Sequence, residues 1–159
     1  MPAESGGKIS ARDQYLTLRL GGEEYAIEIL RVQEIRSFEE PTRMVNTPDC
    51  VRGVLDLRGV IVPIVDLRLM LGVGEARLDD FTVVIVLNVD GQVVGVVVDA
   101  VSDVVELVAD SIKPAPQFES AVDARFIAGL VDLAGRMLIV LRIEALLADP
   151  ELGLRKTAP

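Results

Sequence analysis

Short apolar runs separated by turn-forming residues recur along the chain. From Tyr15 to Leu20 every second residue is leucine, and Gly21-Gly22 separates this run from Glu24-Tyr25-Ala26-Ile27, which is mostly apolar. Alternation with a period of two places successive side chains on opposite faces of a sheet. Paired glycines between two such runs are typical of a tight turn. The pattern predicts a strand, a turn and a second strand.

Two further pairs of runs have the spacing of tight hairpins. They are Val54–Leu57 and Val60–Val65 around Arg58-Gly59, and Val83–Val89 and Gln92–Val98 around Asp90-Gly91. Asp-Gly suits the positive φ angles of a type I′ turn, so the second pair is the clearest hairpin of the chain. Pro63 has no N–H to give to a ladder, which predicts an edge position or a bulge for its run.

The remaining segments follow the same plan. Further strands are expected at 41–45, 101–107, 126–133 and 136–141, while 29–36 fits either a helical face or a broken strand. Short helices are expected at 66–71 and 143–148, and a loop at 111–120. About ten short strands without a long crossover predict an all-β fold, a sandwich or barrel rather than a parallel sheet.

The ordered part is expected to form a single domain at 14–149. Its halves lie at about 14–80 and 81–149, and an exchange of strands between them is left open. Residues 1–13 mix glycine, serine, proline and charges without periodicity, so they are predicted to be a flexible tail, as are residues 150–159.

Charge and composition narrow the expected partners. Acidic residues outnumber basic ones by 25 to 16, the formal net charge is −9, and only 4% of the residues are aromatic. Such a chain repels polyanions at long range and offers little for base stacking, which argues against nucleic acid and anionic membrane surfaces. Polar residues interrupt the valine-rich stretch 83–98, so it is not expected to insert into a membrane.

The inventory of reactive side chains argues against an enzyme. The chain has no histidine and one cysteine, Cys50, which leaves no basis for a zinc site, a Cys-His nucleophile or an internal disulfide. No cofactor is expected. The polar first residues lack a signal peptide, which predicts a cytoplasmic location. Asp56 and Asp66 flank a hairpin and could meet, so a carboxylate-dependent enzyme is the rival from another class.

The most distinctive stretch is Arg52-Gly53-Val54-Leu55-Asp56-Leu57-Arg58-Gly59, followed by Val62-Pro63-Ile64-Val65-Asp66-Leu67-Arg68. Together with 25–36, 94–104 and 135–141, it resembles the CheW family of chemotaxis coupling proteins, in family order from about residue 15 to 148. The family's usual asparagine before Leu-Arg-Gly is Asp56 here. An aspartate at that position still accepts a backbone hydrogen bond.

The resemblance implies two intertwined five-stranded SH3-like β-barrel subdomains with short helices, including a C-terminal one. It also implies a non-enzymatic scaffold that couples transmembrane chemoreceptors to the histidine kinase CheA and is recruited to membrane receptor arrays. One surface would bind the regulatory domain of CheA, and another the cytoplasmic tip of the receptors. A paralogue that serves a non-swimming receptor array is the alternative within the same fold.

The resemblance and the residue chemistry together nominate eight partner-binding residues: Arg58, Gly53, Gly59, Val32, Glu34, Val84, Val101 and Val104. Simpler interpretations compete with this role. Valine at such spacing is more often core, and Glu34 could be a solvated charge. Both glycines could serve only the backbone of a tight turn. On its sequence alone Arg58 is a solvated turn arginine. Arginine is also enriched among binding hot spots, and the family resemblance favours this interface role for it.

Overall fold

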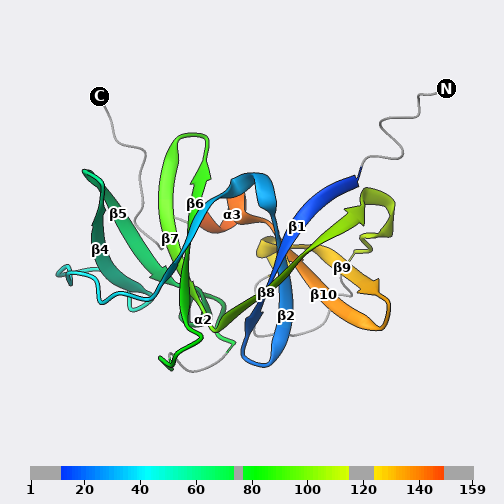
Figure 1. Cartoon of the computed structure of the whole chain (residues 1–159), viewed down its shortest axis with the longest axis horizontal. Coiled ribbons are helices and arrows are strands. Elements are labelled where there is room, and N and C mark those ends of the chain that lie inside the picture. The colour runs from blue at the N-terminus through cyan, green and yellow to red at the C-terminus, as the bar shows by residue number, and fades with distance from the viewer. Residues whose placement is uncertain (1–11, 74–76, 115–123, 149–159) are drawn as a thin grey trace.

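The computed structural model describes residues 12–73, 77–114 and 124–148, which form two five-stranded sheets side by side (Figure 1). The strands are β1 (Arg12–Leu20), β2 (Glu23–Glu28), β3 (Val32–Ser37), β4 (Val51–Leu57), β5 (Val60–Asp66), β6 (Val83–Val89), β7 (Gln92–Val98), β8 (Ala100–Val108), β9 (Ile127–Leu133) and β10 (Arg136–Leu141). The helices are η1 (Ile29–Arg31), α2 (Leu67–Leu71), η2 (Ala109–Ser111), η3 (Ala124–Phe126) and α3 (Ile143–Leu147).

Each sheet combines strands from both halves of the chain. Sheet 1 has the order β8-β1-β2-β10-β9, and sheet 2 the order β3-β6-β7-β5-β4. Neighbouring strands are antiparallel except for β2 with β10 and β5 with β7, which are parallel. The predicted all-β fold with two intertwined five-stranded units and short helices is confirmed.

The two halves of the chain are structural repeats that exchange their first hairpins. Each half runs hairpin, strand, hairpin, helix, and the same interval separates Gly53 from Gly129, Asp56 from Asp132 and Leu67 from Ile143. Sheet 1 combines β1 and β2 with β8–β10, whereas sheet 2 combines β6 and β7 with β3–β5. The halves 14–80 and 81–149 therefore do not correspond to the two sheets, because each half completes the sheet of the other.

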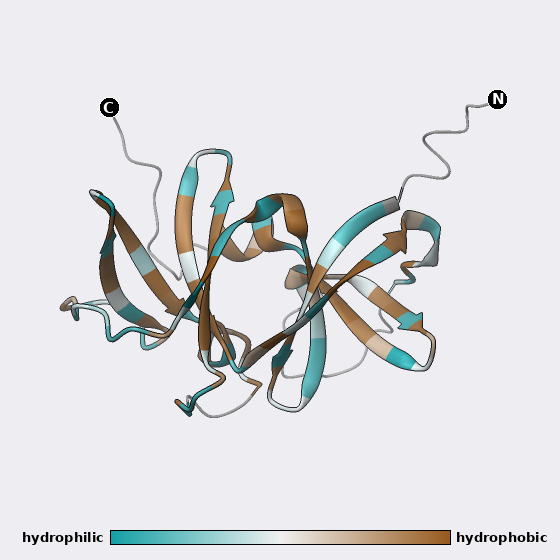
Figure 2. Cartoon of the chain, viewed as in Figure 1, coloured by the Kyte–Doolittle hydropathy of each residue, from teal (hydrophilic) through white to brown (hydrophobic). Residues whose placement is uncertain are grey.

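Three apolar clusters hold this arrangement together. One, which includes Tyr15 and Leu138, is enclosed by sheet 1, and another, which includes Leu55 and Val84, is enclosed by sheet 2. The largest lies between the sheets and takes residues from both, among them Leu18, Ile85 and Leu146. Apolar and polar positions accordingly alternate along many strands in Figure 2. Burial of this third cluster makes the two sheets one body.

Most element boundaries agree with the sequence prediction. The hairpins at 58–59 and 90–91 form as expected, and α2 is capped by the Asp66 side chain and ends at Gly72. Pro63 lies where β5 has β4 as its neighbour, since pairing with β7 begins only at Ile64. The missing N–H of proline is therefore tolerated in a strand that becomes interior one residue later.

Some predictions need correction. Strand β1 already begins at Arg12, so the last two residues of the predicted tail are ordered, whereas 1–11 and 149–159 lie outside the described residues. The strand expected at 41–45 is reduced to a single bridge between Thr42 and Val54. The ambiguous stretch 29–36 is a 3-10 turn followed by β3. The predicted loop 111–120 is described only to Pro114 and includes a bridge from Lys113 to Leu130.

Candidate functional site

The tip of the β4–β5 hairpin is built by local turn chemistry. Arg58 and Gly59 have φ angles of 55° and 88°, the positive values of a type I′ turn. Asp56 Oδ1 accepts a hydrogen bond from the Gly59 N–H at 2.8 Å, which fixes the turn. The same side-chain contact recurs in two of the other three hairpins with positive φ at both turn residues, at Asn88 and Asp132. Asp56 therefore accepts a backbone hydrogen bond, a role that aspartate can fill as well as the family's usual asparagine.

This turn aims Arg58 at the far edge of its own sheet. The Arg58 guanidinium donates to the carboxylate of Glu34 on β3, although β3 and β4 are the two edge strands of sheet 2. Arg36 donates to the same carboxylate at 3.3 Å. The hydrogen bond from Arg58, followed by that from Arg36, outweighs desolvation and holds the pKa of Glu34 below its ordinary value. Two predicted site residues thus meet in one exposed ion pair.

Gly53 is required for a different reason from the one expected. It lies within β4 at a shift in the pairing with β5, not in a tight turn, and its φ is 141°. A Cβ at this position would lie 2.1 Å from the backbone oxygen of Thr42. Gly59, by contrast, has open space around its Cα and needs only the turn conformation. Close packing of the 42–43 backbone thus explains Gly53, and turn geometry explains Gly59.

The four predicted valines separate by exposure. Val84 is 1% exposed inside the cluster of sheet 2, a core position that leaves its side chain no surface for a partner in this structure. Val32 and Val101 are half-buried against the cluster between the sheets. Val104 is 48% exposed on β8, an edge strand of sheet 1. The eight residues therefore do not form one patch, because Val101 and Val104 lie on the other sheet.

Sequence reasoning missed two exposed aliphatic residues beside the turn. Val60 and Ile61 directly follow Gly59 and are 51% and 61% exposed. The apolar run that predicts β5 could have indicated them, because its first two residues precede the part of β5 that pairs with β7. The tip of this hairpin therefore presents an arginine next to two aliphatic side chains.

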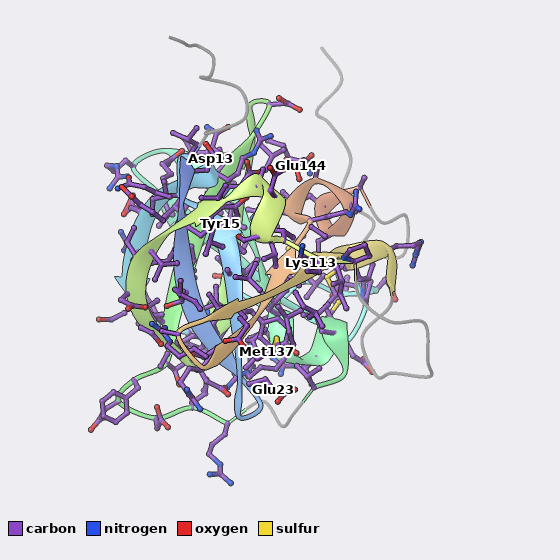
Figure 3. All side chains as sticks on the ribbon, turned by 90° about the vertical axis from the view of Figure 1, so that its right-hand side faces the viewer. Asp13, Tyr15, Glu23, Lys113, Met137 and Glu144 are labelled. Atoms are coloured by element: carbon purple, nitrogen blue, oxygen red, sulfur yellow. The ribbon has the colours of Figure 1, made fainter. Side chains whose placement is uncertain are left out.

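Sheet 1 carries a corresponding charged group that the sequence analysis also missed. Arg136 donates to Glu24 at 2.8 Å and to Asp103 at 3.1 Å. The hydrogen bonds from Arg136 lower the pKa of both carboxyl groups. The same hydrogen bonds and the negative charges of the two carboxylates raise the pKa of Arg136. The neighbouring Met137 is 55% exposed, and Figure 3 shows it near Glu23 at one end of the sheet, with Asp13 and Glu144 at the other end.

The acids proposed for a rival enzyme do not converge. Asp56 is exposed at the turn, whereas Asp66 is fully buried and accepts hydrogen bonds from Arg52 at 3.1 Å and Arg68 at 3.0 Å. Asp66 is therefore held among buried structural contacts, whereas Asp56 serves the exposed turn. Within the described ranges, no group of three or more acidic or cysteine residues has the geometry of a metal site.

The described part of the chain also contains no helix long and apolar enough to cross a membrane. The groove beside the 42–54 bridge is polar and shallow and is lined by Arg43, Asn46, Thr47, Asp49 and Arg52 among others. Taken together, the chemistry of the described residues is that of contact surfaces: an exposed ion pair, exposed aliphatic side chains and buried structural charges.

Comparisons with known proteins identify the family of this chain. The family model of the CheW-like domain matches residues 14–151. The chain is 50% identical over 141 residues to the chemotaxis protein CheW of Klebsiella aerogenes, covering 89% of this chain and 85% of that protein. It is 33% identical over 119 residues to protein FrzA of Myxococcus xanthus, covering 74% and 70% of the two chains.

A solved structure matches the whole fold. The scaffolding protein TtCheW from Thermoanaerobacter tengcongensis superposes with a TM-score of 0.79 at 27% identity, over 87% of this chain and 90% of that one. The fold and the sequence matches agree with one another, and this chain belongs to the CheW-like domain family.

Proposed function

We propose that this protein is a non-enzymatic adaptor that couples transmembrane chemoreceptors to the histidine kinase CheA. One surface binds the regulatory domain of CheA and another binds the cytoplasmic tip of the receptors. The protein works in the cytoplasm and is recruited to receptor arrays at the membrane. By holding kinase and receptor together, it raises their effective concentration, and its rigid sheets transmit geometry from one to the other.

The observation that carries this proposal is the composition of the Arg58 hairpin tip. The Arg58 side chain is 67% exposed, and it stands beside the exposed Val60 and Ile61. Arginine is enriched at protein interfaces, and a partner that docks on this tip would also remove the two exposed aliphatic side chains from water. Its ion pair with Glu34 limits the rotamers of Arg58 before a partner arrives, which reduces the entropy lost on binding.

A helical receptor tip suits the second surface. Val104 is exposed on β8, and Val101 is half-buried on the same strand. An amphipathic helix binds such aliphatic surfaces through side chains on one of its faces. Each of the two interfaces is expected to bury roughly 1,000–1,600 Å² in total, which gives contacts that exchange when the array remodels.

The test is reconstitution of CheA, a receptor cytoplasmic fragment and this protein, with CheA autophosphorylation measured with and without each component. We expect receptor control of the kinase only when all three are present. Arg58→Ala should weaken it, whereas Arg19→Ala, which removes another exposed arginine on sheet 1, should not. Failure of the unmodified protein to form a complex with both partners at once would overturn the adaptor proposal.

A further inference from the structure

The chain passes between the two sheets at two points that are equivalent in the repeat but unequal in structure. The first passage is η1, between β2 of sheet 1 and β3 of sheet 2. The second is Asp99, between β7 of sheet 2 and β8 of sheet 1. Each passage is contacted by the helix that ends one half of the chain. In Figure 1 these helices, α2 and α3, lie on opposite sides of the junction.

Asp99 is hydrogen-bonded to both sheets at once. Its Oδ2 accepts from the N–H of Gly21 in the β1–β2 turn of sheet 1 at 2.8 Å. Its Oδ1 accepts from the guanidinium of Arg68 in α2, which follows β5 of sheet 2, at 2.8 Å. The Asp99 N–H donates to the carbonyl of Arg19 on β1 at 3.1 Å. One residue thus fixes the end of β1 relative to α2.

Arg68 is held in place from the other side. It is fully buried, and its Nε and one terminal nitrogen donate to the two oxygens of Asp66, each at 3.0 Å. Asp66 also caps α2 and accepts from Arg52 on β4. Arg68 consequently cannot change rotamer without leaving buried charges unpaired, which is costly in a protein interior. Asp99 is bonded to a fixed donor.

The first passage has a much weaker connection. Arg31 of η1 donates to Glu144 of α3 at 2.6 Å, with 30% and 44% of the two side chains exposed. Among the described residues this is the one ion pair between η1 and α3. Exposed pairs of this kind contribute little to rigidity, because water and salt screen them. The apolar cluster beneath both passages holds the sheets together, but apolar contact is non-directional and permits small rotations.

We propose that Arg68 and Asp99 are positioning residues that set the angle between the two sheets, and that this contact, rather than the ion pair at the opposite passage, limits rotation of one sheet against the other. The contact determines how the docking surfaces of the two sheets are oriented to each other. For its effect on signalling, this inference rests on the proposed adaptor function. The role of the contact in setting the angle between the sheets does not depend on that function.

The test measures the distance between the sheets in the isolated full-length protein. Spin labels are attached to cysteines introduced at Ile61 of sheet 2 and Met137 of sheet 1, both more than half exposed, in a Cys50→Ser background. Pulsed electron resonance then gives the distribution of the label-to-label distance. Asp99→Asn keeps the shape of the side chain, but its single acceptor oxygen cannot serve both Gly21 and Arg68. We expect it to broaden the distribution.

Arg31→Gln at the opposite passage is the matched control and should leave the distribution as narrow as in the unmodified protein. A distribution that Asp99→Asn leaves unchanged, or that Arg31→Gln broadens equally, would overturn the proposal. Asp99→Ala repeats the test with both acceptors removed. The Asp99 side chain is 35% exposed, so neither substitution empties the core.

A second readout separates positioning from simple loss of structure. With reconstituted components, Asp99→Asn should reduce receptor control of the kinase roughly fivefold or more, the size of a typical coupling between sites. Its separate affinities for the kinase domain and the receptor fragment should stay unchanged. If the unmodified protein gives no receptor control of the kinase, the adaptor proposal fails. The distance measurement still tests whether the contact between Arg68 and Asp99 sets the angle between the sheets. If coupling and both affinities fall together, the positioning role is wrong.

Discussion

Arg58 and Glu34 form an ion pair that joins the tip of the β4–β5 hairpin to strand β3, although β4 and β3 lie at opposite edges of sheet 2. Both were candidates for partner binding, yet nothing in their sequence separation predicts that they touch. The contact brings the two edges of the sheet toward each other and leaves most of the Arg58 side chain accessible to a partner. It makes these two residues testable as one unit.

Arg58→Ala should weaken binding to the partner that docks on this hairpin by about tenfold, a typical loss at a hot-spot arginine. Because an exposed ion pair adds little to folding, the melting temperature should change by less than about 2 °C. Titration calorimetry and thermal unfolding monitored by circular dichroism measure the two effects. A fall in melting temperature that parallels the loss of binding would mean that Arg58 serves the fold.

Glu34→Gln separates the contribution of the ion pair to binding from the contribution of the Arg58 side chain itself. The neutral amide still accepts a hydrogen bond but no longer attracts the guanidinium, so Arg58 loses its preferred orientation while keeping its charge. Binding should therefore weaken less than in Arg58→Ala. The double variant should bind no more weakly than Arg58→Ala, since the two substitutions remove one shared interaction. Additive losses would show that Glu34 contacts the partner independently.

Two glycines at equivalent positions of the repeat should both be intolerant of alanine. A Cβ on Gly53 would lie 2.1 Å from the Thr42 oxygen, and one on Gly129 would lie 2.5 Å from the Lys113 oxygen. Both clashes involve backbone, which cannot rotate away. We expect Gly53→Ala to cost about 3 kcal/mol and Gly129→Ala about 2 kcal/mol in urea unfolding, from overpacking and, at Gly53, backbone strain.

Gly59→Ala is the control for this pair, because only its positive φ opposes a side chain. Its cost should be about 1–2 kcal/mol. A larger loss at Gly59 than at Gly53 would contradict the packing explanation and point to the turn as the critical feature.

The sequence predicted what is decided locally. Each tight hairpin is specified by a two-residue turn between apolar runs, and α2 by Asp66 before its first turn and Gly72 after its last. The exchange of hairpins between the sheets was not predictable from periodicity, because the apolar patterns of the strands do not specify that β2 pairs with β10 and β5 with β7. Periodicity describes the faces of a strand but not its neighbour.

Val84 shows why the site was harder to predict than the fold. Strand β6 places Val84 and Val86 in the cluster of sheet 2, and Ile85 and Leu87 in the cluster between the sheets. A strand buried on both faces has a continuous apolar run, which the sequence does contain. The resemblance to a family outweighed that signal. The pairing of Arg58 with Glu34 depended on sheet curvature, which leaves no mark in a local pattern.

Substitution by asparagine should change the free energy of unfolding very differently at the two aspartates of the rival enzyme hypothesis. Asp56→Asn keeps an acceptor for the Gly59 N–H, so the free energy of unfolding should change by less than about 0.5 kcal/mol. Asp66→Asn leaves the buried Arg68 without its main counter-charge and should cost about 3 kcal/mol or more. Urea unfolding measures both. Equal stability of the two variants would show that the buried pair is not needed.

The acid sensitivity of folding should depend on the group formed by Arg136, Glu24 and Asp103. Hydrogen bonds from Arg136 hold the pKa of both carboxyl groups below their ordinary values of 4.5 and 3.8. When the folded pKa is the lower one, the unfolded chain binds more protons in the acid range, and stability falls as pH falls. The contribution is complete above the ordinary values and is lost as pH drops through the folded ones.

Urea unfolding at intervals between about pH 6 and pH 3 should therefore show a shallower loss of stability in Asp103→Asn than in the unmodified protein, since one linked proton is removed. Asp90→Asn, which removes an exposed turn carboxylate without an ion-pair partner among the described residues, should follow the unmodified protein. The effect should shrink in high salt, because the Asp103 side chain is 48% exposed. Parallel curves for Asp103→Asn and the unmodified protein would mean that Arg136 does not stabilise the charged form of this carboxyl group.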